Sequence, residues 1–358
     1  MTAPTGGSAA IAVVVPARNQ GTELSRLLAS LRAQAPPEIS LELVVVDDAS
    51  EEDLAPICAR FDARRLRLDR PSGPARARNE GARCTSSPLL LFLDADVLCP
   101  PGLFAAIDSA LVAEPEALAV SFRSTGFDPS RRLVANFAAA LEHYWLGFYL
   151  AGGRALAALP GVTTRNVVVR RPAFERIGGF DPVFRTNAIE DYDFGKRLSE
   201  SGRTLICGRP ELPHRFPAKL SRLLRNYAVR ASLFGRYYLG RRPRLDPVQV
   251  AAGEALLRLL GTVGLLTLAF APSTSAAPWL AAAGGGLLAA YLFAIRGFLA
   301  HAARLGSRRF AALCALIHVA TSPVIVAGAG WGFVAGSAER LRRGPQRGGW
   351  LRGAGVEP

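Results

Sequence analysis

The sequence predicts an α/β domain with a largely parallel sheet, followed by apolar helices long enough to cross a membrane. In the first half of the 358-residue chain, short runs of β-branched and aliphatic residues alternate with longer mixed segments. This pattern is typical of parallel strands connected by helices. From residue 250 the chain changes to long stretches of Leu, Ala, Val and Gly, which are typical of membrane spans.

Three apolar runs, each followed by polar residues, predict the first strands of the sheet: Ile11 to Val15, Leu43 to Val46 and Leu89 to Leu93. Parallel sheets bind their ligands beyond the carboxyl ends of the strands. The polar clusters that follow these runs therefore mark the expected site.

Helices are predicted between and after these strands. Leu24, Leu27, Leu28 and Leu31 recur at helical spacing, and Thr22 is the expected N-cap of that helix. A second helix is expected after Ser50, because the acidic residues 51–53 favour the positive end of a helix.

Three apolar stretches predict two or three membrane spans between residues 250 and 336: Leu256 to Phe270, Trp279 to Ile295 and Phe310 to Val334. The alternative is a set of buried helices in a soluble domain. Arginines before the first stretch and after the second place those ends in the cytoplasm by the positive-inside rule. The arginines between 340 and 347 break this pattern, so the third stretch folds back near Ser322-Pro323, or one stretch is interfacial, or the rule fails here.

Residues 216–245 join the two halves and are predicted to form a basic amphipathic helix on the membrane surface, since apolar residues from Leu220 to Tyr238 follow helical spacing among arginines. An ordinary surface helix that packs on the sheet domain is the alternative. Residues 1–9 and the basic tail 337–358 are expected to be disordered.

Charge is distributed unevenly along the chain. Residues 1–202 carry 22 Lys and Arg against 24 Asp and Glu, whereas residues 203–358 carry 21 against 5. The arginines of the second half flank apolar stretches, which favours a membrane surface and argues against nucleic acid. The five cysteines include no Cys-x-x-Cys pair and the N-terminal residues lack a signal-peptide pattern, so we expect a cytoplasmic-membrane protein whose catalytic domain faces the cytoplasm.

Asp94-Ala95-Asp96 directly follows the third predicted strand. Two carboxylates at this spacing can bind a hard divalent cation and, through it, a diphosphate. A solvated turn would carry the same residues.

Two further clusters end the other strands. Asp47-Asp48 follows the second strand, and Pro16-Ala17-Arg18-Asn19 follows the first. A carboxylate at this position can accept the imide N–H of uracil, and the turn after the first strand can offer backbone groups to the same base. Helix capping is the alternative role for one of the two aspartates.

The segment from Gly73 to Gly81 carries Arg76, Arg78 and Asn79 on a glycine-bounded turn that leads into a helix. Planar guanidinium groups near a helix N-terminus suit diphosphate oxygens, although a solvated face would look the same.

Together these motifs resemble the nucleotide-sugar-binding half of family 2 glycosyltransferases with the GT-A fold, a Rossmann-like and mostly parallel sheet with flanking helices. The acceptor half is similar as well, and the likeness extends over residues 10–235. The segments that carry it are Pro16 to Asn19, Val44 to Ser50, Gly73 to Gly81, Leu91 to Asp96, Thr164 to Arg170, Phe174 to Asp181 and Glu190 to Arg197. The resemblance implies a GT-A domain over residues 10–215, divided into a nucleotide-sugar half (10–100) and an acceptor half (101–215).

The resemblance also implies roles for single residues on the donor side. Asp47 or Asp48 would contact uracil, Asp94 would meet the nucleotide, and Asp96 would coordinate Mn²⁺ or Mg²⁺. Arg78 would stabilise charge on the diphosphate together with the metal. The turn Pro16–Asn19, Asn79 and Ala95 would complete the donor site.

On the acceptor side, Asp191 would be the general base of an inverting transfer. Arg165, Asn166 and Glu190 would bind the acceptor, with Glu190 positioning either the acceptor or Asp191. His214 would be a third metal ligand or a structural histidine.

Two features define the expected acceptor. The chain has Arg225 to Arg230 where a processive polymerase would carry a Gln-x-x-Arg-Trp motif, so transfer of a single sugar is favoured. The aromatic segment Leu133 to Leu150 either cradles a lipid acceptor or is plain core.

The sequence therefore predicts an inverting transferase that moves one sugar from a nucleotide-diphospho-sugar donor, UDP-sugar being favoured, to a lipid-linked or membrane-associated acceptor in cell-envelope glycan or glycolipid synthesis. A catalytically silent nucleotide-sugar-binding membrane protein is the main alternative. A nucleotidyltransferase fits less well, because the chain has only Lys196 and Lys219 and lacks a lysine in a glycine-rich turn after the first strand.

Overall fold

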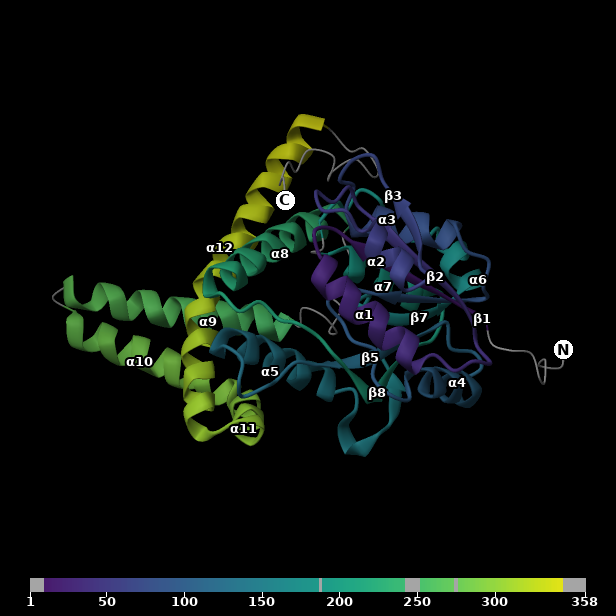
Figure 1. The fold of residues 1–358 in the computed structure, drawn as a ribbon. Coiled ribbons are helices and arrows are strands. Elements are labelled where there is room, and N and C mark those ends of the chain that lie inside the picture. Colours follow the sequence, from purple (N-terminus) through teal and green to yellow (C-terminus); the bar gives the residue numbers. More distant parts are fainter. Residues whose placement is uncertain (1–9, 187–188, 242–251, 274–275, 344–358) are drawn as a thin grey trace. The chain divides into compact units, whose positions relative to one another are not determined.

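The computed structural model describes residues 10–186, 189–241, 252–273 and 276–343. The chain divides into two compact units. One holds the residues up to Thr125 together with Trp145–Arg215, and the other holds Gly126–Tyr144 together with the residues from Phe216 onward. Among the described residues, all strands belong to the first unit and the second is helical (Figure 1).

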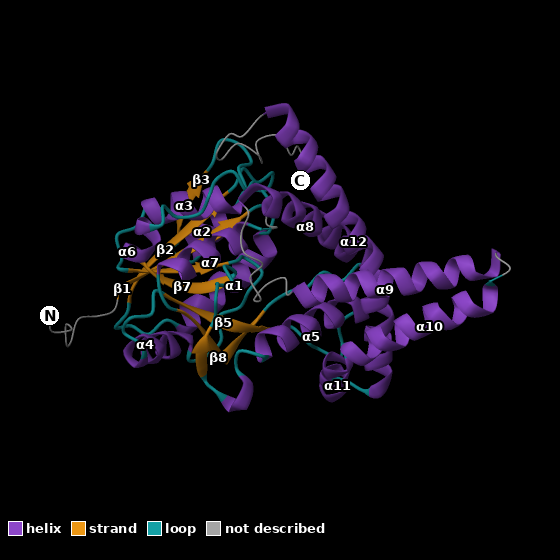
Figure 2. Cartoon of the chain, turned by 180° about the vertical axis from the view of Figure 1, so that it is seen from behind, coloured by secondary structure: helices purple, strands orange, loops and turns teal. Residues whose placement is uncertain are grey.

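The first unit is built on an eight-stranded sheet with the order β3-β2-β1-β4-β7-β5-β8-β6. The strands β3, β2, β1 and β4 run parallel, whereas β7 pairs antiparallel with both β4 and β5 (Figure 2). The predicted α/β class is confirmed, with the uninterrupted parallel part limited to these four strands. The strands are β1 (Ala10–Ala17), β2 (Ser40–Asp47), β3 (Arg64–Arg67), β4 (Leu89–Leu93), β5 (Ala119–Thr125), β6 (Leu156–Ala158), β7 (Asn166–Arg170) and β8 (Thr204–Pro213).

Strand β1 lies between two apolar cores. Its residues Ile11, Val13 and Val15 pack with the leucines of α1 (Gly21–Gln34). Its residues Ala12 and Val14 pack on the other side with alanines of α3 (Pro74–Arg83). Because strand side chains alternate between faces and both faces are covered, a continuous apolar run is required. All three strands predicted from such runs are confirmed.

The remaining helical segments of the first unit are short. They are α2 (Ala55–Arg60), α4 (Leu103–Ala113), η1 (Ala151–Gly153), α6 (Arg171–Arg176) and α7 (Glu190–Ser201).

The predicted helix starts were wrong in detail. Helix α1 begins at Gly21 with Gln20 as its N-cap, so Thr22 lies inside the first turn. The backbone N–H of Gly21 donates to Oε1 of Glu52 at 2.8 Å, so a distant carboxylate takes the role expected of a local cap. Helix α2 begins only at Ala55, and no acidic residue lies in its first turn.

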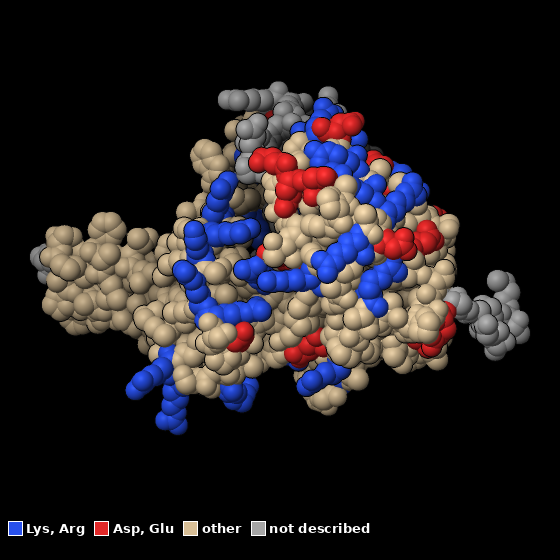
Figure 3. Space-filling view, in the orientation of Figure 1, with Lys and Arg blue, Asp and Glu red and all other residues tan. Residues whose placement is uncertain are grey.

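The second unit contains three helices long and apolar enough to cross a membrane, namely Glu254–Ser273, Ala277–Ala294 and Arg308–Leu341. Large apolar side chains on them are exposed: Trp279 is 81% exposed and Phe270 and Trp331 are each 64% exposed. The outer part of the α9–α10 pair carries neither basic nor acidic atoms in Figure 3. The helices of this unit are α5 (Leu133–Gly147), α8 (Leu220–Arg241), α9 (Ala252–Phe270), η2 (Ala271–Ser273), α10 (Ala277–Ala294), α11 (Arg296–Leu305) and α12 (Arg308–Arg343). Helix α5 belongs to this unit as far as Tyr144.

Helix α12 is continuous through Pro323. The expectation that the third stretch folds back near Ser322-Pro323 is therefore wrong. Residues 337–343, expected to begin the disordered tail, also belong to this helix. The expectations for residues 1–9 and for the rest of the tail lie outside the described residues.

Glycines bring α8 and α12 into contact at backbone distance. A Cβ on Gly332 would collide with the carbonyl oxygen of Ser232, and a Cβ on Gly235 would lie 2.6 Å from the carbonyl oxygen of Ala329. Small residues that permit close helix approach are typical of helix pairs in membranes. The predicted amphipathic segment is thus helical from Leu220 to Arg241, and small residues of this helix pack against α12. Residues 242–245 of the prediction lie outside the described residues.

A buried polar network links α9, α10 and α12. Arg258 is 3% exposed, and its guanidinium donates to Oε1 of Glu254 at 2.7 Å and to Nε2 of His318 at 2.9 Å. Because arginine has no acceptor, Nε2 of His318 must accept, and Nδ1 then donates to the Tyr291 hydroxyl at 2.6 Å. The Tyr291 hydroxyl in turn lies 2.8 Å from Oγ of Ser322.

Candidate active site

The carboxyl ends of β1, β2 and β4 meet at one edge of the sheet. Strand β1 pairs in parallel with both neighbours, and Ala17 lies opposite Asp47. The backbone N–H of Asp48 donates to the carbonyl of Ala17 at 2.9 Å. The structure therefore brings together the three polar clusters that the sequence singled out.

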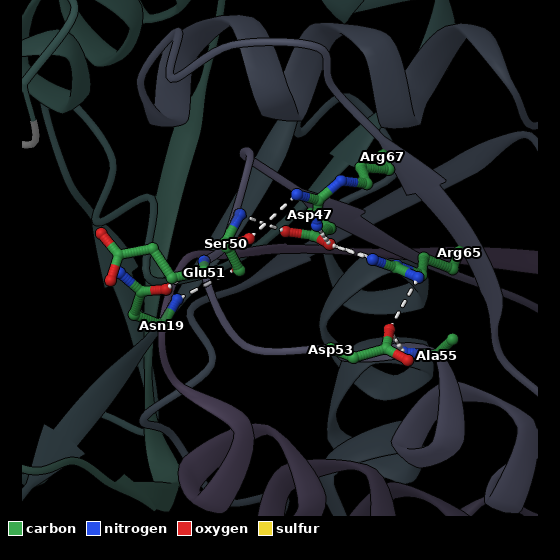
Figure 4. Close-up of polar contacts among 8 residues, drawn as sticks. All are labelled: Asn19, Asp47, Ser50, Glu51, Asp53, Ala55, Arg65 and Arg67. Carbon is green, nitrogen blue, oxygen red and sulfur yellow. Dashed lines mark hydrogen bonds and ion pairs between the residues drawn. The ribbon is translucent and has the colours of Figure 1, made fainter.

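The turns after β1 and β2 are bonded to each other (Figure 4). The backbone N–H of Asn19 donates to Oγ of Ser50 at 3.1 Å, and Oδ1 of Asn19 accepts from the N–H of Glu51 at 2.8 Å. Asn19 and Ala49 both adopt positive φ angles, 51° and 55°. Pro16 and Ala17 still belong to the strand, so the turn that faces a ligand begins at Arg18.

Asp47 is fully buried and its carboxylate is occupied by protein groups. Oδ1 accepts from the N–H of Ser50 at 2.8 Å, and Oδ2 accepts from Arg65 at 2.7 Å and from Arg67 at 2.8 Å (Figure 4). Burial opposes ionisation, but the bonds from Ser50, Arg65 and Arg67 outweigh it and hold the pKa of Asp47 below its ordinary value. Asp47 thus ties β2 to β3, which leaves its predicted contact with uracil without support from the geometry.

Asp48 anchors the loop before α3. Its two carboxylate oxygens accept from the N–H groups of Ser72 and Gly73 at 2.7 and 2.9 Å. Gly73 has φ +87°, and a Cβ there would collide with the backbone of Arg185, so only glycine suits this position. Neither aspartate caps a helix; α2 has Leu54 at that position.

Arg78 and Asn79 on α3 are buried, at 2% and 6% exposure. The Arg78 guanidinium donates to Oδ1 of Asp94 at 2.6 Å and to Oε1 of Glu190 at 3.2 Å. The amide of Asn79 bonds both the N–H and the C=O of Phe180, at 2.9 and 2.8 Å. Both side chains were expected to bind the donor, and both are instead engaged with protein groups.

The Asp94-Ala95-Asp96 turn is held from two sides. The N–H of Asp94 donates to the carbonyl of Arg165 at 3.0 Å, and Ala95 is buried. Asp96 lies opposite His214, with Nε2 to Oδ2 at 3.4 Å. Burial opposes ionisation of Asp96, but the hydrogen bond and charge of His214, with the charge of Arg165, hold its pKa below the ordinary value.

The metal ligands expected at this turn do not gather into one cluster. Within the described ranges, no group of three or more His, Cys, Asp or Glu side chains is arranged to hold a metal ion. Asp94 faces Arg78, while Asp96 and His214 face each other. The carboxylate of Asp96 and the imidazole of His214 are groups that can coordinate Mn²⁺. Mg²⁺ is commonly bound by one or two protein carboxylates, and substrate phosphates and water supply the other ligands.

Asn166 was expected to bind the acceptor but lies fully buried at the start of β7. Its Nδ2 donates to Oγ of Ser124 at 3.0 Å, and its Oδ1 accepts from Oγ1 of Thr163 at 2.9 Å. Its role is therefore to join β5 and β7. Its neighbour Arg165 lies close enough to Asp96 for its charge to act on that carboxylate.

The first turn of α7 carries three acidic residues with different exposure. Glu190 is 3% exposed and bonds Arg78, and Asp193 is fully buried and bonds Arg197 at 2.8 Å. Asp191 is partly exposed, and its Oδ1 accepts the N–H of Tyr192 at 2.8 Å. Of the three carboxylates, Asp191 is thus the one that is partly exposed to solvent.

Sequence reasoning missed four residues of this site. Arg65 and Arg67 alternate on β3 and neutralise Asp47; their spacing of two was a readable signal of one strand face. Glu52 holds the start of α1. Phe180 lies under the Arg78 guanidinium at 5.3 Å and stacks on Phe194 at 4.0 Å, and no local pattern indicates these contacts.

Comparison with known proteins shows what this chain is similar to. Residues 12–178 match the family described as glycosyl transferase family 2. A pre-mycofactocin glycosyltransferase of Mycobacterium tuberculosis is 30% identical over 202 residues, covering 54% of this chain and 40% of that protein. A validoxylamine A glucosyltransferase of Streptomyces hygroscopicus subsp. limoneus is 30% identical over 235 residues, covering 57% and 52%. The chain thus spans about half the length of these relatives or less.

A solved structure has the same fold. It is a mannosyltransferase from Pyrobaculum calidifontis in complex with GDP-Man and Mn²⁺, with a TM-score of 0.56, 20% identity and coverage of 90% of this chain and 86% of that one. This likeness confirms the GT-A-type fold that the motifs implied. Residues 12–178 are thus similar to family 2 glycosyl transferases, and the likeness to the solved structure extends to the fold.

Proposed function

We propose that the protein transfers a single sugar, with inversion, from a nucleotide-diphospho-sugar to a hydroxyl of a lipid-linked or membrane-associated acceptor. The observation that carries this proposal is the bridge of Arg78 between Asp94, at the end of β4, and Glu190, at the start of α7. It joins the edge expected to bind the donor to the helix that bears the candidate base. The family match and relatives named as glycosyltransferases support the same class of reaction.

Asp191 is proposed as the general base, because it is the only partly exposed carboxylate in the first turn of α7. Its carboxylate takes the proton of the acceptor hydroxyl as that oxygen bonds to the anomeric carbon. The bond from the anomeric carbon to the diphosphate breaks on the opposite face, and the diphosphate leaves with the electron pair. Inversion follows from this single displacement.

Asp96 and His214 are proposed to hold Mn²⁺ or Mg²⁺, whereas Asp94, the other carboxylate of this turn, pairs with Arg78. The donor set fits, since it offers carboxylate oxygens and one imidazole nitrogen at the mouth of the sheet. When bound there, the cation would neutralise negative charge on the departing diphosphate.

The nucleobase is proposed to lie against the turn at Arg18 and Asn19, with UDP-sugar as the favoured donor. The Asp47 carboxylate accepts hydrogen bonds from two arginines, and the Asp48 carboxylate accepts them from two backbone N–H groups. The imide N–H of the base would therefore donate to a remaining lone pair of the Asp48 carboxylate or to a backbone carbonyl of the turn.

A membrane-associated acceptor is proposed from the exposed apolar helices of the second unit. Side chains such as Trp279 and Phe270 are unfavourable in water, and the basic α8 suits an anionic membrane surface. With Arg304 after the second apolar helix and Arg308 and Arg309 at the start of the third, the positive-inside rule favours a catalytic domain in the cytoplasm. The proposed role is cell-envelope glycan or glycolipid synthesis.

Nucleoside diphosphate release tests the proposal. Membranes that carry the protein are given a panel of UDP- and GDP-sugars with Mn²⁺ and a native lipid extract. We expect release that depends on one sugar, on the metal and on Asp191, as judged by Asp191→Asn. Nucleotide binding without release above the Asp191→Asn level would identify a silent nucleotide-sugar-binding protein instead.

A further inference from the structure

Arg78 is a buried charged side chain at the sheet edge, and its partners come from distant parts of the chain. Asp94 is 16 residues away and Glu190 is 112 residues away. The Arg78 and Glu190 side chains are 2% and 3% exposed, whereas the Asp94 side chain is 32% exposed. The guanidinium thus lies between a carboxylate that reaches solvent at the donor edge and one enclosed at the acceptor edge.

The orientation of this guanidinium is fixed by several contacts. Its two terminal nitrogens bond two different carboxylates. Its Cζ atom lies 5.3 Å from the centre of the Phe180 ring. Phe180 is itself held by both backbone bonds to Asn79 and by stacking on Phe194. A guanidinium that contacts two carboxylates and one aromatic ring has little freedom to turn toward a ligand.

The two ion pairs also constrain their partners. Glu190 begins α7, and Asp191 is the next residue along that helix. Any movement of the start of α7 relative to the end of β4 would break a buried ion pair, and leaving a buried charge without its partner is strongly unfavourable. The bridge therefore sets the spacing between the donor edge and the candidate base.

We infer that Arg78 is a positioning residue that couples the donor and acceptor sides of the site, rather than a ligand of the diphosphate. It holds Asp94 and Glu190 at fixed places, and through Glu190 it sets where Asp191 meets the acceptor hydroxyl. This inference rests on the proposed function, because it describes how the groups that take part in the proposed reaction are kept at fixed positions.

Arg78→Lys is the direct test. Lysine keeps the positive charge but presents a compact ammonium that cannot bond both carboxylates as a fork does. We expect unchanged nucleoside diphosphate binding and donor KM, and a kcat for transfer lower by about 100-fold, since a misplacement of about 1 Å costs that much. We also expect a larger share of donor hydrolysis over transfer, because water needs no fixed acceptor geometry.

Arg83→Lys is the matched control. Arg83 ends the same helix, its side chain is 65% exposed, and it pairs with the nearby Glu80. Glu190→Gln is the second variant, since it removes one charge of the bridge at nearly constant size. We expect Glu190→Gln to give the same rise in hydrolysis over transfer. Because both variants disrupt one bridge, the double variant should cost less than the two single effects combined.

Each outcome decides between the possibilities. A wild-type protein that is inactive with every donor removes the proposed function and this inference with it. An active wild type with Arg78→Lys equal to Arg83→Lys overturns the inference alone. Loss of nucleotide binding in Arg78→Lys with unchanged kcat would make Arg78 a diphosphate ligand. If Arg78→Lys does not fold, Glu190→Gln with a wild-type ratio of hydrolysis to transfer overturns it.

Discussion

At the scale of single residues, Asp47 joins two strands through a buried carboxylate. Its charge is matched by Arg65 and Arg67, whose side chains are 21% and 47% exposed. Bonds between charged groups and a buried partner contribute more than exposed ion pairs. The residue that the sequence indicated as a base contact is thus a structural element of the site.

We expect Asp47→Asn to lower the free energy of unfolding by about 2 kcal/mol, because two arginines lose their charged acceptor. Thermal unfolding in detergent measures the change. Asp62→Asn is the control: Asp62 is fully exposed, its φ of 48° suits asparagine, and its pair with Arg32 lies at the surface, so little change is expected. Equal effects of the two substitutions would contradict the structural role.

The same substitution has a pH signature. A carboxyl whose folded-state pKa is lowered stabilises the fold above its unfolded-state pKa of about 4. That contribution is lost as the pH falls through the lower, folded-state value. The difference in unfolding temperature between wild type and Asp47→Asn should therefore be full at neutral pH and shrink below about pH 4. A difference that persists unchanged in acid would show that charge is not its cause.

The sequence predicted which residue types gather at the site but not how they pair. That Asp47, Asp94 and Asn19 share one edge followed from three strand ends. The contacts of Arg78 with Glu190 and of Asn79 with Phe180 span 112 and 101 residues, and no spacing or periodicity encodes partners that far apart. This is why Arg78 and Asn79, although recognised, were expected to face the donor.

At the scale of elements, apolar runs predicted strands and long helices well, whereas helix starts depended on tertiary contacts. Glu52, 31 residues away, holds the N-terminus of α1, so the local signal at Thr22 was misleading. The length of α12 is also informative. Its 36 residues extend about 54 Å, against a hydrocarbon core of about 30 Å, so arginines at both ends can lie outside the core while the helix crosses once.

The contact between α8 and α12 gives a prediction with a control two residues away. Gly332→Ala should destabilise the protein by about 1 to 3 kcal/mol, because the added Cβ meets the backbone of Ser232. Gly330→Ala has open space and should be neutral or stabilising by about 1 kcal/mol. Unfolding temperatures in detergent compare the two. A Gly332→Ala protein as stable as Gly330→Ala would exclude the close contact.

The polar network of Arg258, Glu254 and His318 gives a second prediction for the apolar helices. Arg258→Met should destabilise the second unit by about 3 kcal/mol, because it leaves the partly buried Glu254 and the buried His318 without their partner. Arg304→Met is the control, since Arg304 is exposed on α11. Detergent thermal unfolding again provides the measurement. Stability of Arg258→Met at the level of Arg304→Met would mean that the network does not join these helices.

At the scale of the whole molecule, the division of charge along the chain anticipated two kinds of structure. The near-neutral half contains seven of the eight strands and most of the candidate site. The basic, apolar half contributes β8 and His214, and its other described elements are helices. No sequence pattern predicted that residues 126–144 group with the C-terminal helices. Their grouping comes from aromatic packing such as Phe137 on Phe298, 6.0 Å between ring centres, which becomes visible only in three dimensions.

Incorporation of a labelled sugar into the lipid fraction tests the central claim most directly, because it separates transfer from donor hydrolysis. Wild type, Asp191→Asn and Asp108→Asn, an exposed control on α4, are compared with the active donor and Mn²⁺. We expect metal-dependent incorporation by wild type and Asp108→Asn, an anomeric configuration opposite to that of the donor, and loss of incorporation in Asp191→Asn. Retained configuration, or full activity of Asp191→Asn, would contradict an inverting transfer with Asp191 as its base.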